Sequence, residues 1–493
     1  MNRDLLSLCG PLREALHRTD YTADALLDAL GDDAHAALGR GEPVPVRRAT
    51  RDAGELGLLA RLFLLGDDCS ASEVAAVLAP VDLDHAVAAG LLERDGALVR
   101  AALDLRPMDL GGGDRWVLSD LDGSMRPRTT APDHVLGVGH ASLSLLRGTP
   151  TAPTGTVLDV GTGCGVQALH ATGYAGSVTA TDINLRALDL SAATFALNEV
   201  DVELVAGSWF DPVAERTFDR VVANPPFVVG RARVEHTYRD SGLDLDGASE
   251  LMISRAIDHL APGGTASMLA SWVHVEGEDW RSRVASWLPA HGVDAWIVQR
   301  DVADPALYVG TWMRDAGLDP RDPATAAQAE AWLGHFADNE VEGIGFGFVY
   351  LRRTDAPSDV LAEDLRHGYS DPLGDEALGY LDRAAWLRDR DVLEERFALS
   401  PATALERVYL PGDDGWRQVV ARAHRGDGPA WQHEVDDLAA ALLGGMRADG
   451  LALGELVELL AAAHGEESGP LADAAVTLVH GLVRHGLVLP VPR

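Results

Sequence analysis

The stretch T-V-L-D-V-G-T-G-C-G, from Thr156 to Gly165, decides how the rest of this chain can be placed. Its first five residues form a short, mostly apolar run with two valines, which is typical of a buried parallel strand. Gly161, Gly163 and Gly165 follow at alternate positions. Glycine tolerates positive φ and, having no Cβ, lets a ligand lie against the backbone. The next residues can open a helix whose free N–H groups face that ligand, so the sequence predicts a ligand site at this turn.

Two acidic residues narrow the kind of ligand, because sites for dinucleotides, ATP and S-adenosylmethionine (SAM) all use such a turn. Asp159 lies two residues before the first glycine, giving D-x-G-x-G-x-G rather than the patterns of a dinucleotide site or a P-loop. Asp182 ends a second predicted strand, where a carboxylate can accept the hydroxyl protons of a ribose. Asp182 could instead cap the helix that begins near Leu185. Together with the glycines, the two acids favour a nucleoside pocket.

A second informative stretch is F-D-R-V-V-A-N-P-P-F, a predicted strand that runs into Asn224, Pro225, Pro226 and Phe227. Two prolines fix φ and remove two N–H donors, so no internal donor competes for the local carbonyls. The Asn224 side-chain oxygen and the Pro225 carbonyl can accept both protons of a planar NH₂ group, while the Phe227 ring lies against its flat face. Acceptors that bind better as the nitrogen pyramidalises stabilise a transition state selectively. The alternative is a rigid turn at a strand end.

Taken together, these motifs resemble the class I SAM-dependent methyltransferases, in particular the amino-methyltransferases with an N-P-P-F/Y signature. The resemblance covers roughly residues 133–353. The stretches V-L-D-V-G-T-G-C-G-V-Q-A-L, T-D-I-N-L-R-A-L and V-V-A-N-P-P-F look like the release-factor glutamine methyltransferases (the HemK/PrmC type). They look equally like the small-domain ribosomal RNA guanine methyltransferases (the RsmC type).

The resemblance implies SAM as cofactor and a role for each matching residue. Asp159, Gly161, Gly163 and Gly165 would surround the methionine part of SAM, and Asp182 would hold the ribose with Asn184 beside it. Ser208 would lie near the adenine, and Trp209 and Asn224 would also bind the cofactor. The catalytic group would be Asn224, Pro225, Pro226 and Phe227, which would hold the acceptor nitrogen. The family often has an acid at the position of Ser208, so the adenine contact of this chain departs from the pattern.

The region around these motifs predicts an α/β fold with a doubly wound, Rossmann-like sheet, because strand and helix patterns alternate. The strand candidates are residues 156–160, 178–181, 202–205, 220–223, 265–270, 295–299 and 345–351. Residues 305–338 read as an insertion that shapes the acceptor side. A glycine-containing segment ahead of the first strand offers Gly137, Gly139 and His140 as pocket walls, or as a simple docking helix.

Two mainly helical, winged-helix-like domains are expected to flank this core. The predicted domains are residues 1–125, the methyltransferase domain 126–354 and residues 360–493. The first has helical patterns at 5–17 and 21–30, a connector at 42–51, and three helices followed by a strand pair. The last has helices at 435–446, 454–463 and 471–484 before an apolar strand. Few cations lie in the first domain, so interaction or dimerisation is at least as plausible as nucleic-acid binding.

Composition limits the remaining possibilities. The 493 residues carry a formal charge of −35, and all 41 basic residues are Arg, a bias that G+C-rich codon usage explains. No apolar run approaches the ~20 residues of a membrane span, so we expect a cytoplasmic protein without a membrane partner. Three scattered cysteines and singly placed histidines predict neither a disulfide framework nor a metal site.

The acceptor is the least determined feature: a protein amide, a nucleic-acid base amine or a small metabolite amine would all fit. Arg231, Arg233, His236 and Arg239 form a basic cluster that could grip RNA phosphates, or could pair with the acids that follow. The charge of −35 repels a polyanion, which favours a protein glutamine or asparagine amide, with an RNA or DNA base as the alternative. A non-catalytic SAM-binding regulatory protein is a further alternative, although the intact Asn224–Phe227 signature argues against it.

Overall fold

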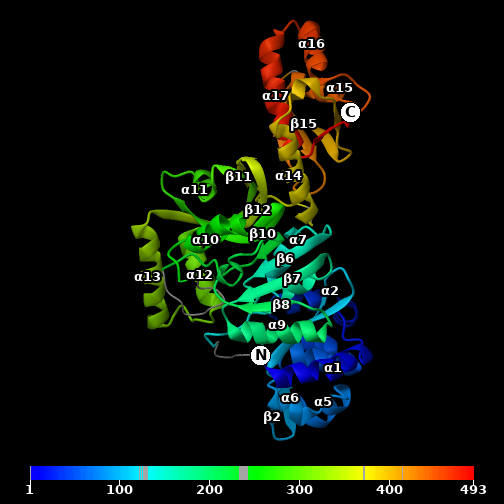
Figure 1. Ribbon diagram of the computed structural model, residues 1–493, viewed down its shortest axis with the longest axis vertical. Coiled ribbons are helices and arrows are strands. Elements are labelled where there is room, and N and C mark those ends of the chain that lie inside the picture. Colours follow the sequence, from blue (N-terminus) through cyan, green and yellow to red (C-terminus); the bar gives the residue numbers. More distant parts are fainter. Residues whose placement is uncertain are drawn as a thin grey trace.

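The computed structural model describes residues 2–121, 123, 125, 131–231, 242–369, 372–413 and 415–492. The molecule is elongated, with an N-terminal part, a central α/β part and a C-terminal part stacked along its long axis (Figure 1). In the described ranges, no helix is both long and apolar enough to cross a bilayer.

An eight-stranded sheet forms the centre of the molecule, with strand order β13-β11-β12-β10-β9-β6-β7-β8. Its strands are β6 (Thr154–Val160), β7 (Ala175–Asp182), β8 (Glu203–Ala206), β9 (Phe218–Ala223), β10 (Leu260–Val275), β11 (His291–Ala303), β12 (Val341–Pro357) and β13 (Asp359–Asp364). The run β10-β9-β6-β7-β8 is parallel throughout, and β12 is antiparallel to both neighbours. The predicted doubly wound sheet is therefore confirmed. Its order reverses between β6 and β9, where such sheets bind ligands.

The sheet extends past the predicted end of the methyltransferase domain. Strand β13 pairs in parallel with β11, from Asp294 opposite Asp359 to Gln299 opposite Asp364. The sequence interpretation ended this domain at residue 354 and began the next at 360. It missed β13 because the six residues D-V-L-A-E-D hold only three apolar side chains between two acids, too short and too polar to predict a core strand.

Helices cover the sheet and add one separate lobe. The covering helices are α7 (His140–Gly148), α8 (Val166–Ala171), α9 (Leu185–Leu197), α10 (Gly247–Ala256) and α11 (Trp280–Ser286). The predicted insertion forms α12 (Pro305–Asp315) and α13 (Pro323–Asp338), which connect β11 to β12. These two helices have their own apolar cluster, centred on Tyr308 and Phe336.

The N-terminal part consists of helices, a small antiparallel sheet in the order β1-β3-β2 and a two-stranded ribbon. Its elements are α1 (Arg3–Arg18), α2 (Ala23–Gly39), α3 (Pro43–Ala49), α4 (Gly54–Leu59), α5 (Ala71–Val77), α6 (Leu83–Ala88), β1 (Cys69–Ser70), β2 (Leu92–Asp95), β3 (Leu98–Ala101), β4 (Leu103–Asp109) and β5 (Asp114–Asp120). The expected connector at 42–51 is instead mostly helix α3, because Pro43 occupies the first turn, where proline is tolerated. The winged-helix assignment stays a prediction.

The ribbon of the N-terminal part is fixed to helix α9 of the core. The Asn198 side chain accepts a hydrogen bond from the Trp116 N–H at 3.0 Å and donates one to the Trp116 carbonyl at 2.7 Å. The Leu118 N–H donates to the Thr194 hydroxyl at 3.1 Å. These buried bonds satisfy the backbone groups at one edge of the ribbon. The N-terminal part and the core also share one continuous apolar interior.

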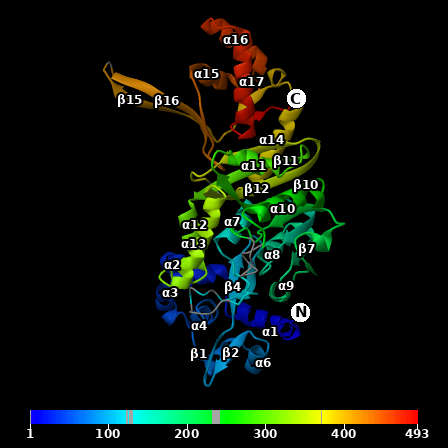
Figure 2. The ribbon, with the colours of Figure 1, turned by 90° about the vertical axis from the view of Figure 1, so that its left-hand side faces the viewer.

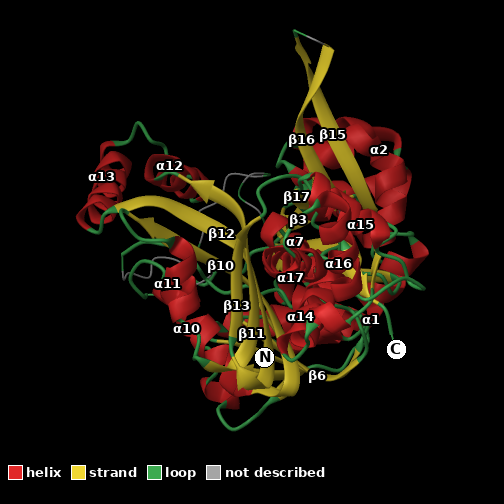
Figure 3. Cartoon of the chain, turned by 90° about the horizontal axis from the view of Figure 1, so that it is seen from above, coloured by secondary structure: helices red, strands yellow, loops and turns green. Residues whose placement is uncertain are grey.

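The C-terminal part combines helices with a long hairpin that the sequence interpretation did not foresee. Its elements are α14 (Gly374–Arg388), β14 (Phe397–Leu399), β15 (Thr403–Gly412), β16 (Gly415–Arg425), β17 (Gln432–Glu434), α15 (Asp437–Gly445), α16 (Leu453–His464), α17 (Ser468–Arg484) and β18 (Val488–Pro490). Helices α15 to α17 match the predicted ones. The β15–β16 hairpin projects well beyond the body of the molecule (Figures 2 and 3).

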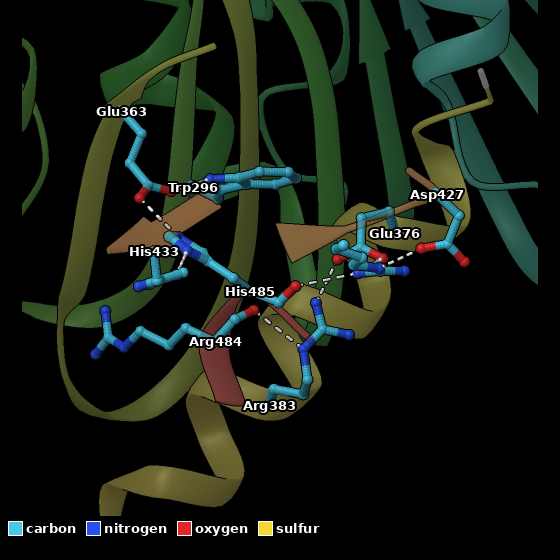
Figure 4. Close-up of polar contacts among 9 residues, drawn as sticks. Trp296, Glu363, Glu376, Arg383, Asp427, His433, Arg484 and His485 are labelled. Carbon is cyan, nitrogen blue, oxygen red and sulfur yellow. Dashed lines mark hydrogen bonds and ion pairs between the residues drawn. The ribbon is translucent and has the colours of Figure 1, made fainter. Parts of the chain in front are cut away.

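A polar network joins the C-terminal part to the central sheet (Figure 4). His485 Nε2 lies 2.8 Å from the Glu363 carboxylate of β13, which also accepts a hydrogen bond from Trp296 Nε1 of β11 at 2.9 Å. His433 Nε2 lies 2.8 Å from His485 Nδ1. The Trp431 ring stacks on His485 with centroids 4.1 Å apart. This chain of hydrogen bonds joins the two parts alongside the ion pairs of Arg388 with Asp294 and of Arg484 with Asp359.

Candidate active site

A cavity of about 340 Å³ opens at the carboxyl ends of β6, β7 and β9, where the order of the parallel strands reverses. Many of the predicted site residues line it: Gly161, Gly163, Asp182, Asn184, Ser208, Trp209, Asn224, Pro225 and Pro226. Three others, Asp159, Gly165 and Phe227, are not among the lining residues, so their predicted contacts with a ligand stay predictions.

The glycines of the turn have two distinct environments. All three have positive φ, at 73° for Gly161, 56° for Gly163 and 85° for Gly165. A Cβ added to Gly161 or Gly163 would meet no atom within 4 Å, whereas one on Gly165 would lie 3.0 Å from Phe195 and Ser191. The first two glycines leave space on the cavity side, and the third allows α8 to pack closely against α9.

Asp159 supports the turn from behind. It is 1% exposed, and one carboxylate oxygen accepts hydrogen bonds from the Thr162 hydroxyl at 2.7 Å and the Ala168 N–H at 3.1 Å. Burial raises the pKa of Asp159 to about 7, against the lowering effect of these two bonds. Asp159 thus ties the end of β6 to the first turn of α8 and positions the residues that line the cavity.

Asp182 lies at the cavity with spare hydrogen-bonding capacity. Its two carboxylate oxygens accept from the Gly163 N–H at 2.9 Å and the Asn184 N–H at 2.8 Å. Burial raises its pKa, and the same two bonds oppose that rise. A carboxylate has about four acceptor positions, so further donors can be accommodated. The helix-cap alternative is wrong, since the side chain that caps α9 is Asn184, which accepts from the Arg186 N–H at 3.0 Å.

The segment before α7 forms the front wall of the cavity. Gly137 and Gly139 line it as expected, together with Val135, whereas His140 begins α7 and is not a lining residue. Asn184 Nδ2 donates to the Asp133 carbonyl at 2.9 Å, which fastens this segment across the cavity mouth.

The buried acid Asp120 also holds the segment before α7 that forms this wall of the cavity. Asp120 accepts from the Val135 N–H at 2.9 Å and forms an ion pair with Arg186. Burial raises the pKa of Asp120, but the hydrogen bonds from Arg186 and Val135 outweigh it and hold the pKa below its usual value. The wall is therefore attached to both the N-terminal part and α9.

The residues after β8 close the cavity at its far end. Ser208 and Trp209 both line it, and Trp209 has φ of 49°, in the left-handed region. The Gly207 N–H donates to the Asp182 carbonyl at 3.0 Å, which holds this loop beside the end of β7. A Cβ on Gly207 would lie 2.3 Å from Pro212, so only glycine fits there.

The Asn-Pro-Pro corner follows β9 directly and faces the cavity from the other side. Asn224 Nδ2 lies 3.5 Å from the Ser142 hydroxyl oxygen of α7, at the long limit of a hydrogen bond. This orientation leaves Asn224 Oδ1 available as an acceptor. Phe227 is half-buried against the main apolar core, and its carbonyl accepts from the Ser271 hydroxyl at 2.6 Å.

The α12–α13 lobe holds the loop that continues from this corner. The Val229 N–H donates to the Tyr308 hydroxyl at 2.7 Å, and the Val229 carbonyl accepts from Trp332 Nε1 at 3.2 Å. A Cβ on Gly230 would lie 2.9 Å from the Trp332 ring. The sequence gave no local signal for these contacts, because the partners lie 79 and 103 residues from Val229.

Of the predicted basic cluster, only Arg231 belongs to the part of the chain that the structure describes, and Arg233, His236 and Arg239 lie outside it. No group of three or more His, Cys, Asp or Glu side chains that could hold a metal occurs among the described residues.

The cavity offers open space and acceptor groups that suit SAM. Its wall includes two glycines whose Cβ positions are open, and a carboxylate with free acceptor positions. Two buried oxygens of lining residues, Thr181 Oγ1 and Gln167 Oε1, have no hydrogen-bond partner within the described ranges. Buried polar atoms are nearly always paired, so both oxygens are suited to donors of a bound ligand.

Comparisons with known proteins agree with this geometry. Residues 137–272 match the methyltransferase small domain, and residues 18–102 and 378–490 match two domains of unknown function, DUF7059 and DUF7782. The ribosomal RNA small subunit methyltransferase C of Erwinia tasmaniensis is 30% identical over 160 residues, 32% of this chain and 42% of that protein. Its Pseudomonas aeruginosa counterpart is 36% identical over 121 residues, 24% of this chain and 33% of that protein. The chain thus spans less than half the length of the curated relatives it matches.

The solved structures that match part of this chain include the T. thermophilus 16S rRNA N2 G1207 methyltransferase in complex with AdoMet and guanosine. It is 18% identical, covers 44% of this chain and 58% of its own, and has a TM-score of 0.27. The [4+2]-cyclase SpnF is 18% identical, covers 44% of this chain and 80% of its own, and has a TM-score of 0.29. With the sheet order and the glycine turn in place, the match over residues 137–272 supports a SAM-dependent methyltransferase of class I in the central part of this chain.

Proposed function

We propose that this protein is a SAM-dependent N-methyltransferase whose acceptor is the exocyclic amine of an RNA base. The observation that carries the proposal is that one cavity is lined by both Asp182 with its glycine turn and the Asn224–Pro226 corner. SAM held beside Asp182 and the glycine turn would face an acceptor held by the Asn224–Pro226 corner.

SAM, when bound, supplies a methyl group that its sulfonium already activates. Gly161 and Gly163 would lie against its methionine part, and Asp182 would accept hydrogen bonds from its ribose. Thr181 and Gln167 supply two further acceptors for its donors. The segment fastened by Asn184 would cover it and exclude water.

The Asn224 corner would hold and align the acceptor nitrogen. Asn224 Oδ1 and the Pro225 carbonyl would accept its two protons, and these bonds strengthen as the nitrogen becomes tetrahedral. Fixed prolines keep both acceptors in place before the reaction, so little reorganisation is needed. A general base is unnecessary, because the proton can leave to water after the N–C bond has formed.

The relatives favour RNA over the protein amide that the net charge suggested. Those that match the central domain are named as ribosomal RNA methyltransferases. A net charge of −35 acts against RNA at long range, but local cations can override it at a binding surface.

Radiolabelled SAM incubated with the protein and a cell extract, followed by separation of RNA, DNA and protein, tests the acceptor. We expect label in the RNA fraction. Label in the protein fraction would indicate that the acceptor is a glutamine or asparagine amide. SAM binding without label in any fraction would indicate a non-catalytic SAM-binding protein. Either result would overturn the RNA assignment.

The Asn224→Ala variant tests the corner. We expect SAM affinity to stay within a few-fold of the parent and turnover to fall by roughly 100-fold or more, because an acceptor used in the transition state is lost. Asn339→Ala, which removes an asparagine at the end of α13 outside the cavity, is the matched control. Equal turnover in the Asn224→Ala variant would refute the assigned role.

A further inference from the structure

The β15–β16 hairpin is the most exposed element of the C-terminal part. Its strands pair from Thr403 opposite Arg425 to Gly412 opposite Gly415. Within the described residues, β17 pairs with β16 only from Arg422 to His424. The outer part of the hairpin is therefore a two-stranded ribbon, which is only marginally stable by itself in water. Such a ribbon is expected to have a partner that covers it.

One face of the ribbon combines aromatic rings with polar side chains. Residues opposite each other share a face, and alternate residues along a strand return to it. The pairs Tyr409 opposite Gln418 and Pro411 opposite Trp416 therefore place both aromatic rings on one face, with Arg407 next along β15. Trp416 is 74% exposed and Tyr409 is 44% exposed. Flat rings presented in this way are the platforms on which unpaired bases stack.

Unlike the rest of the molecule, the hairpin carries no net negative charge. Residues 403–425 carry four Arg against three acids, a net charge of +1, and the remaining chain carries −36. Arg425, at the base of the hairpin, is held in ion pairs with Glu376 and Asp427. Two other ribbon cations are weakly engaged: Arg407 lies 4.0 Å from Asp437, and Arg422 lies 3.9 Å from Glu406. Solvent-exposed pairs at such distances contribute little, so these guanidinium groups can turn to phosphates. A polyanion would therefore meet less repulsion at this arm than at the body of the molecule.

The arm points to the side of the molecule on which the cavity opens. The carboxyl end of β10 pairs with the start of β12, immediately after α13, so α12 and α13 lie at the carboxyl edge of the sheet. The hairpin projects from the same side as α12 and α13 in two perpendicular views (Figures 2 and 3). A macromolecule whose base enters the cavity would extend past this side.

We propose that the β15–β16 hairpin is an arm that binds the RNA substrate, with unpaired bases stacked on Tyr409 and Trp416 and phosphates held by Arg407 on the same face. This inference rests on the proposed function, since it names the surface that brings RNA to the same site. It also gives an acidic protein a specific place at which to hold a polyanion.

Fluorescence anisotropy of a fluorescein-labelled single-stranded RNA of about 20 nucleotides, without SAM, measures the arm directly. The full chain is compared with Trp416→Ala, with the Tyr409→Ala/Trp416→Ala double variant and with Arg407→Gln. We expect the Kd to rise roughly 10-fold in the first and roughly 100-fold in the second, because each stacked base is lost separately. Arg407→Gln should reduce the slope of log K against log salt by about 0.7, one phosphate contact on a single strand.

Leu459→Ala and Arg51→Gln are the controls, one an exposed leucine of α16 and the other an exposed arginine of the N-terminal part. Both should bind RNA like the parent. Unchanged affinity in the Tyr409→Ala/Trp416→Ala variant would overturn the arm. So would light scattering that shows a dimer in the parent and a monomer in Trp416→Ala, since the occupant would then be a second copy.

The two proposals fail in different ways. If the parent methylates RNA and the arm variants keep full RNA affinity, the arm is refuted and the proposed activity stands. If the arm variants lose RNA affinity but the parent transfers no methyl group, the activity is refuted and the arm stands.

Discussion

At the scale of single residues, the glycine motif performs two tasks that its regular spacing conceals. Gly161 leaves room on the cavity side, whereas Gly165 removes a Cβ that would press on Phe195 and Ser191. Both have positive φ, so an L side chain is strained at either position. Ligand binding and stability should therefore respond differently at the two positions.

Gly165→Ala should lower the free energy of unfolding by roughly 2–4 kcal/mol, because a left-handed backbone and an overpacked contact both add cost. Gly161→Ala should cost only about 1–2 kcal/mol of stability but weaken SAM binding at least 10-fold, since its Cβ projects into the ligand space. Denaturant unfolding and calorimetric titration with SAM measure the two effects. Gly334→Ala, inside helix α13 with no atom within 4 Å, is the control and should be neutral or stabilising. Normal SAM binding by Gly161→Ala would contradict the placement of the ligand.

The buried carboxylate of Asp159 should make stability depend on pH. Its pKa in the folded protein, about 7, lies above the ordinary value of 3.8, so the folded state holds this proton more tightly than the unfolded state does. The contribution of Asp159 to the free energy of unfolding is therefore present at low pH and is lost as pH rises through about 7. Asn at this position can accept the same two hydrogen bonds without ionising. The melting temperature of Asp159→Asn, relative to that of the parent, should increase as pH rises across this range. If the difference between the two melting temperatures stays constant, Asp159 does not make the stability depend on pH.

At the scale of elements, the α12–α13 lobe determines the position of the acceptor loop. Tyr308 and Trp332 bind the N–H and the carbonyl of Val229, two residues after the Asn-Pro-Pro-Phe corner. Val229 is fully buried, so a lost partner would leave a backbone group unsatisfied.

Tyr308→Phe should lower the free energy of unfolding by about 1–3 kcal/mol and reduce methyl transfer to RNA, because the loop beside Asn224 loses a fixed point. SAM affinity should not change, because neither Tyr308 nor Val229 lines the cavity. Thr311→Ala removes an exposed hydroxyl from the same helix and serves as the control. A Tyr308→Phe variant with unaltered turnover and weakened SAM binding would contradict the separation of the two subsites.

The core elements could be predicted from the sequence because strand patterns, glycines and prolines are local signals. The seven predicted strands and the helices between the early ones are confirmed. The β15–β16 hairpin could not be predicted, since large apolar residues such as Leu405, Leu410 and Trp416 are exposed and no buried face produces an alternation of apolar and polar residues. The support that Tyr308 gives to Val229 was likewise invisible, because it depends on tertiary proximity alone.

At the scale of the whole molecule, buried polar contacts attach both flanking parts to the core. Asn198 and Trp116 join the N-terminal ribbon to α9, and Glu363, His485 and His433 join the C-terminal part to the sheet. The β15–β16 arm and the cavity are therefore connected through these contacts. Weakening the contact of Glu363, His485 and His433 should affect how RNA bound at the arm reaches the cavity.

His433 should make this junction sensitive to acid. Burial, together with the neighbouring His485, lowers the pKa of His433 to about 4, although Glu363 acts in the opposite direction. Folding therefore favours the neutral ring, and the stabilising contribution present above pH 6.5 is lost as pH falls towards about 4. Calorimetric melting as a function of pH should show a smaller loss on acidification in His433→Asn than in the parent. An equal loss in both would assign the acid sensitivity to other groups.

Nucleoside analysis of RNA incubated with SAM and the full chain tests the central claim most directly. After complete digestion, we expect a purine or pyrimidine nucleoside methylated on its exocyclic nitrogen, formed by the parent and absent with the Asn224→Ala variant. RNA nucleosides that stay unmethylated while the protein binds SAM would contradict it.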